Sequence, residues 1–213
     1  MRMAWRGSIV VAVLLFMIAT GVGEAQPIAD CRAPHRPAIG FALGRSSPYF
    51  EPSLGSGGPG TSGSTLTRGS VVFDGRLDLS IAGPWRARVE GAVTDWRLER
   101  QIYSADLRQV VATESLGHVD VRDIVGLAGW QGGRAPVCGY VLGGGGLYAL
   151  GYQGAAHRSP GVALTAGVEI PGGPRGVVHV EVQLHLINAQ SRYPIGSSTV
   201  LDGRIVAGWA YRF

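Results

Sequence analysis

Two histidines and the glutamate between them are the residues of this sequence whose types could bind a metal. His179, Glu181 and His185 occupy alternate positions of one segment, so on a β-strand their side chains would share a face. The histidines are six residues apart, which is roughly 20 Å along an extended strand and too far for one ion. We therefore predict no metal site and no cofactor.

The sequence contains only weak signals for a catalytic site or a nucleotide-binding site. A serine hydrolase needs a nucleophile, a base and an orienting group together; Ser80 with His179 or His185 is conceivable, but no motif fixes the set. The glycine-rich string at 144–149 loosely matches a dinucleotide-binding pattern, which requires a following helix that the sequence does not predict. We predict no catalytic residue, and a lipid-modifying enzyme stays open as an alternative.

The elements that position these residues are predicted to be strands. Apolar and polar residues alternate in segments separated by turn residues, namely 38–50, 69–82, 85–103, 117–130, 137–152, 160–170, 177–189 and 200–213. The connections after the second, fourth and sixth segments are short. Longer polar connections, 51–68, 104–116, 153–159 and 190–199, follow the others. This asymmetry is typical of bacterial outer-membrane barrels, so we predict an all-β, eight-stranded antiparallel transmembrane β-barrel.

Charged residues fall on one face of these strands and aliphatic residues on the other. An eight-stranded barrel is only wide enough for its side chains to fill it. We therefore predict a paired, charge-plugged lumen that conducts poorly. Its residues are Asp74, Arg76, Asp78, Arg86, Arg88, Glu90, Asp120, Arg122, Glu169, His179, Glu181, His185, Asp202 and Arg204. Alternation is lost near Asp95 and Asp123, where β-bulges could restore the faces.

The same alternation fits a soluble, secreted, lipocalin-like barrel, with its apolar face turned inward around a lipid ligand. Its charged face would then be solvated. Net charge does not help to choose, since the basic residues are scattered and interleaved with acids, to a net +4. This distribution does not indicate a nucleic-acid partner.

The beginning of the chain predicts export. Arg2 and Arg6 precede a short apolar run, and small residues follow up to Ala25. This arrangement indicates a signal peptide over residues 1–25. Residues 26–37 are then an N-terminal segment at the periplasmic side, and residues 38–213 form the barrel domain.

The last strand carries the most specific pattern. Trp209, Tyr211 and Phe213 lie at every second position, with apolar residues before them and Arg204 and Arg212 on the opposite face. The chain resembles the small OmpA/OmpX-type outer-membrane barrel proteins of Gram-negative bacteria, whose last strand typically ends in this way. The resemblance implies an outer-membrane location, insertion into outer-membrane lipid as a monomer, and recognition of these aromatic residues by the assembly machinery. It implies structural or surface-interaction roles through the loops without naming a partner.

The sequence contains two cysteines, which could form a disulfide. With the predicted strand count, Cys31 precedes the first strand and Cys138 begins the fifth, so both lie at the periplasmic rim. The periplasm permits disulfides, and a dozen residues are long enough to cross the barrel mouth. We predict a Cys31–Cys138 disulfide that holds the N-terminal segment across the opening.

Overall fold

The computed structural model describes residues 31, 36–50, 55–56, 61–104, 109–134, 136–172, 174–189 and 199–213. Its strands are β1 (Ala38–Phe50), β2 (Gly55–Ser56), β3 (Thr61–Arg68), β4 (Val71–Ala82), β5 (Trp85–Ser104), β6 (Gln109–Arg134), β7 (Val137–Tyr152), β8 (Ala155–Pro171), β9 (Gly176–Asn188) and β10 (Thr199–Arg212). The described residues include no helix long and apolar enough to cross a membrane.

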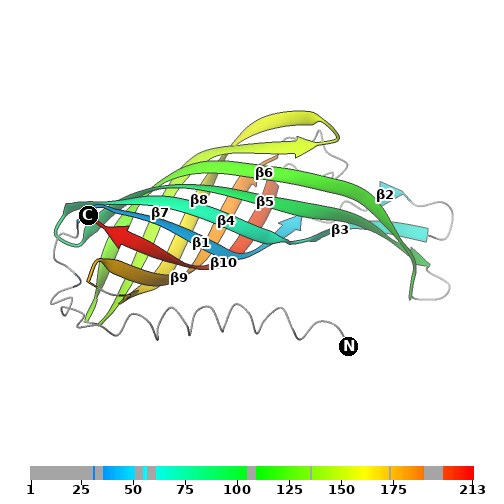
Figure 1. Ribbon diagram of the computed structural model, residues 1–213. Coiled ribbons are helices and arrows are strands. Elements are labelled where there is room, and N and C mark those ends of the chain that lie inside the picture. Colours follow the sequence, from blue (N-terminus) through cyan, green and yellow to red (C-terminus); the bar gives the residue numbers. More distant parts are fainter. Residues whose placement is uncertain are drawn as a thin grey trace.

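Eight of these strands close into a barrel (Figure 1). The order around the ring is β4-β1-β10-β9-β8-β7-β6-β5, and the β5–β4 pairing closes it. All the pairings are antiparallel, including that of β1 with β10, which joins the two ends of the chain. The short β2 and β3 lie outside the ring, where β3 pairs with the far half of β5. The predicted eight-stranded antiparallel barrel is confirmed.

Several strands are longer than the sequence predicts. β5 has 20 residues and β6 has 26, so most of the predicted loop 104–116 is strand. The predicted loop 153–159 is a two-residue turn, in which Gln153 and Gly154 have φ angles of 48° and 82°. Positive φ at both central residues suits the tight turn of a β-hairpin. Residues 109–116 and 155–159 lie in the predicted polar loops but form strands, because they pair with β5 and β7 beyond the apolar part of the outer wall. The predicted loop 190–199 lies almost entirely outside the described residues.

The barrel has two different ends (Figure 1). At one end, which we call the turn end, short connections join β4 to β5, β6 to β7 and β8 to β9, and the chain finishes at Phe213. At the other, the hairpin end, β5 and β6 project with β3 far beyond the rest of the ring.

The outer wall of the ring carries a band of exposed apolar side chains, which we call the apolar belt. Its exposed large side chains include Phe41, Phe73, Val89, Ile124, Leu147, Leu164, Val182 and Ile205. Trp85 and Trp130 are exposed next to the turn end. The lipocalin-like interpretation is therefore wrong, since it would place this apolar face inside and the charged face in water.

β5 and β6 keep strict alternation through the places where the sequence suggested bulges. Residues 86 to 98 of β5 are buried at every second position, and the register shifts between β5 and β6 come only beyond Leu98. What changes is the polarity of both faces. Outward residues turn from apolar Val93 to charged Asp95, while inward residues turn from charged Glu90 to apolar Trp96. The bulge interpretation is wrong, because one regular strand passes from an apolar to a polar exterior.

Candidate functional site

Charged side chains fill the interior of the barrel, as predicted. The predicted residues that are buried are Asp74, Arg76, Asp78, Arg86, Arg88, Glu90, Glu169, His179, Glu181, His185, Asp202 and Arg204. They lie at alternate positions of β4, β5, β8, β9 and β10, which is the periodicity of one sheet face.

Asp120 and Arg122 were assigned wrongly, since both are exposed on the outer wall. The inward residues of β6 are Val119, Val121 and Asp123, all buried. Asp123 is therefore a lumen residue that the sequence interpretation missed. The signal was present, because a carboxylate within the apolar belt has no favourable place except the interior. Asp120 and Arg122 on the opposite face pointed the other way, so alternation alone did not settle which face of β6 points inward.

Six residues form what we call the turn-end charge cluster: Arg76, Asp78, Arg86, Arg88, Glu169 and Glu181. Asp78 is 2.8 Å from Arg86 and 2.7 Å from Arg88. Arg86 also reaches Glu169 at 2.7 Å. Arg76 spans the lumen to contact Glu169 at 3.1 Å. These contacts join side chains of β4, β5 and β8 across the inside, so each buried charge has an opposite charge beside it.

Tyr140 on β7 completes this cluster. Its hydroxyl donates to Glu181, which also accepts from Arg88 at 2.9 Å and from Arg76. The guanidinium carbons of Arg86 and Arg88 lie 5.0 and 5.1 Å from the centre of the Tyr140 ring, within cation–π range. A cavity of about 10 Å³ lies beside Arg86 at this end, at the lower limit for one water molecule.

A second group of charges lies closer to the hairpin end. Arg204 donates to Asp123 and to Asp202, at 2.7 Å each. Asp202 accepts from the hydroxyl of Ser46 at 2.7 Å, and that hydroxyl accepts from the indole N–H of Trp96 at 2.9 Å. This chain of contacts links β6, β10, β1 and β5 and ends on an aromatic ring.

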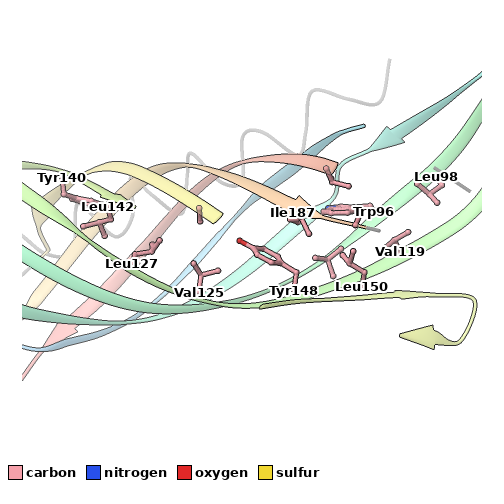
Figure 2. Close-up of a cluster of buried hydrophobic side chains, with 14 residues drawn as sticks. Trp96, Leu98, Val119, Val125, Leu127, Tyr140, Leu142, Tyr148, Leu150 and Ile187 are labelled. Carbon is pink, nitrogen blue, oxygen red and sulfur yellow. The ribbon is translucent and has the colours of Figure 1, made fainter. Parts of the chain in front are cut away.

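Beyond Trp96 the interior is apolar, which the sequence interpretation did not foresee. The buried side chains here, which we call the apolar cap, are Trp96, Leu98, Val119, Val121, Leu150, Ile187, Ala189 and Val200. Figure 2 shows Trp96, Val119, Leu150 and Ile187 gathered inside the strands, with Leu98 beyond them. Trp96 and Leu98 have no exposed surface. The same apolar cluster continues toward the turn end along β6 and β7 as Val125, Leu127 and Leu142, beside the charged residues. The lumen is therefore filled by charged and apolar side chains together toward the turn end, and mainly by apolar side chains beyond Trp96.

The histidines take part in this packing. His185 is 2.8 Å from the hydroxyl of Tyr148 and 3.4 Å from Gln183, which donates to Asp74 at 3.0 Å. His179 lies 3.9 Å from Glu181. Within the described residues no group of side chains has the arrangement of a metal site. The side chain of Ser80 lies outside the described residues.

The structure contains a disulfide between Cys31 and Cys138, whose Cα atoms are 5.5 Å apart. Cys138 lies on β7 at the turn end, and Cys31 is 1% exposed. The bond therefore holds the segment before β1 against the turn end. Apart from Cys31, Arg36 and Pro37, the N-terminal segment lies outside the described residues, as does the predicted signal peptide.

The filled lumen gives an expectation for transport. Purified protein in a planar bilayer is expected to show no stable, large conductance steps, because ions would have to pass both the turn-end charge cluster and the apolar cap. Single-channel recording measures this directly. Regular large steps from monomeric protein with the folded, heat-modifiable gel mobility would contradict a filled lumen.

Comparison with known proteins supports the fold. No protein-family model and no curated protein matches the chain. Among solved structures, Neisserial surface protein A is similar, with 14% sequence identity and a TM-score of 0.53 over 83% of this chain and 97% of that one. The outer membrane protein OprG from Pseudomonas aeruginosa is similar at 14% identity and a TM-score of 0.56, over 87% of this chain and 99% of that one. The chain therefore has the fold of the small outer-membrane β-barrel proteins.

Proposed function

We propose that the protein is a monomeric, non-enzymatic outer-membrane protein with the turn end in the periplasm. Its filled barrel is the anchor, and the projecting strands at the hairpin end are its interaction surface. The observation that carries the proposal is the change of polarity along β5 and β6. Outward residues are apolar up to Val93 and Ile124, and the next outward residues are charged, namely Asp95 and Arg97 on β5 and Arg122 and Asp120 on β6. Val93 pairs with Arg122, so the change falls at nearly the same height on both strands.

The length of the strands supports the same division. A tilted strand crosses the apolar layer in about 9–11 residues, whereas β6 has 26. The projecting part has the side chains of a water-facing sheet. Cross-strand ion pairs join Arg100 to Glu114 at 3.9 Å and His118 to Asp95 at 2.9 Å. Residues 109–115 are all exposed. A partner would thus find a strand pair exposed on both faces, with these ion pairs and with exposed Tyr103, Val110 and Val111.

Site-specific labelling in intact Gram-negative cells tests the location and the orientation. Ala112→Cys lies in the projecting part of β6, and Arg175→Cys lies in the turn between β8 and β9; both positions are exposed. A membrane-impermeant maleimide is expected to label the first variant in intact cells, and the second only after permeabilisation. Labelling of Arg175→Cys in intact cells, or of neither variant there, would contradict the proposal.

The aromatic side chains of β10 are proposed to be recognised during assembly. Tyr211 lies between Trp209 and Phe213, with ring centres 6.1 and 5.6 Å away, and Phe213 is 55% exposed. This arrangement leaves a continuous aromatic surface on the outer wall. Phe213→Asp is expected to lower the level of outer-membrane protein sharply, measured by fractionation and heat-modifiable mobility. Phe213→Tyr is the control, and unchanged levels for the aspartate variant would argue against recognition.

A further inference from the structure

Two exposed arginines, Arg122 and Arg158, lie on the outer wall next to the apolar belt, on the side formed by β6, β7 and β8. Arg122 on β6 pairs with Ala149 on β7, and Ala149 pairs with Arg158 on β8. Both arginine side chains are exposed. Since adjacent strands are about 4.8 Å apart, the two Cα atoms are separated by roughly 10 Å. The small Ala149 between them leaves room for both guanidinium groups to approach one bound group.

The surface between these arginines is hollow. A cavity of about 490 Å³ is lined by Arg122 and Arg158, and by the apolar side chains of Ile124 and Leu147. Ile124 is 67% exposed and Leu147 is 61% exposed. The hollow thus has a cationic border toward the hairpin end and an apolar border toward the belt.

The charge of this region is not balanced within the described part of the protein. The ion pairs of the described residues include neither Arg122 nor Arg158, whereas the neighbouring His118 is paired with Asp95. On the same face, Asp120 lines an adjoining hollow of about 310 Å³ with Arg122. Asp123 also lines the hollow, but it is buried and paired with Arg204 in the lumen. The two guanidinium groups and the carboxylate of Asp120 therefore leave an excess of positive charge on the outer wall.

We propose that this hollow binds one phosphorylated glycolipid of the lipid A type from the outer leaflet. Arg122 and Arg158 hold its phosphate, and its acyl chains lie along Ile124, Leu147 and the belt below them. Guanidinium groups bind phosphate through paired, charge-assisted hydrogen bonds. A soluble anion would contact only the two arginines. A lipid would contact the arginines with its phosphate and Ile124 and Leu147 with its acyl chains. The inference rests on the outer-membrane location proposed above.

Retention of lipid through purification tests the site. Full-length protein is inserted into zwitterionic phospholipid vesicles containing bisphosphorylated lipid A, extracted with mild detergent and examined by native mass spectrometry. The wild type is expected to retain one lipid A molecule. The double variant Arg122→Gln/Arg158→Gln is expected to retain at least about tenfold less, since it loses the charge-assisted bonds. The wild type is expected to retain dephosphorylated lipid A no better than the double variant retains bisphosphorylated lipid A.

Matched variants separate a site from general surface charge. Arg45 is an exposed arginine on β1, which is diametrically opposite β7 in the ring, and Arg45→Gln is expected to leave retention unchanged. Asp120→Asn is expected to leave retention unchanged or to raise it.

Heat-modifiable mobility establishes that each variant is folded, and the cysteine labelling above tests the location separately. Equal retention by the double variant and the wild type would overturn the proposal, as would an equal loss in Arg45→Gln. If the double variant retained as much lipid A as the wild type but differed in oligomeric state, the proposal would also be overturned. The surface around Arg122 and Arg158 would then contact a second copy of the protein.

Discussion

Replacement of Glu181 with glutamine is expected to lower the free energy of unfolding of the barrel by about 3–5 kcal/mol, the usual cost of removing one partner from a buried ion pair. Glu181 is 2% exposed and accepts from Arg76, Arg88 and Tyr140. Glutamine has nearly the same shape but no charge, so two buried guanidinium groups lose a counter-charge. Urea unfolding in lipid vesicles, followed by heat-modifiable mobility, measures the change.

Glu114→Gln is the matched control for this prediction. Glu114 lies 3.9 Å from Arg100 on the projecting strands, and about half of each side chain is in contact with solvent. An exposed pair of this kind contributes at most about 1 kcal/mol. Equal effects of the two glutamine variants would show that the turn-end charge cluster does not hold the barrel together.

Replacement of Trp96 with alanine is expected to cost about 3–5 kcal/mol, because the apolar cap would lose its largest side chain and keep a cavity. Trp96 is fully buried and also donates to Ser46. The same unfolding experiment measures the loss. Conductance is expected to stay undetectable, since the turn-end charge cluster still fills the other half of the lumen.

Trp96→Phe separates packing from hydrogen bonding. Phenylalanine keeps a ring in the apolar cap but cannot donate to Ser46, so a loss of about 1 kcal/mol is expected from the missing bond. If Trp96→Phe cost as much as Trp96→Ala, the hydrogen bond to the charged group around Arg204 would be the main contribution, and the cap would not be a packed layer.

Much of the barrel could be predicted from alternation. β1 and β7 begin and end where the sequence predicts, because β7 is apolar outward along its whole length, β1 is apolar outward from Ile39 to Leu43, and turn residues follow both strands in the sequence. The inward arginines and carboxylates of β4, β5 and β9 follow from the same periodicity, since a side-chain period of two leaves only two possible faces. The aromatic residues at the end of β10 likewise marked its outward face.

The face of β6 and the apolar cap were decided only by the tertiary structure. Val119, Val121 and Asp123 share one face, and Asp120 and Arg122 share the other, so both faces of β6 mix charged and apolar residues. Alternation identifies a strand. It identifies the inward face only where each face keeps the same polarity along the strand. On β5 and β6 the exterior changes from apolar to charged, and on β5 the interior changes from charged Glu90 to apolar Trp96 at nearly the same height. The position of this change is known only from the pairing of the strands in the closed barrel. That pairing places Arg122 opposite Val93, and Ile124 opposite Leu147, on the outer wall.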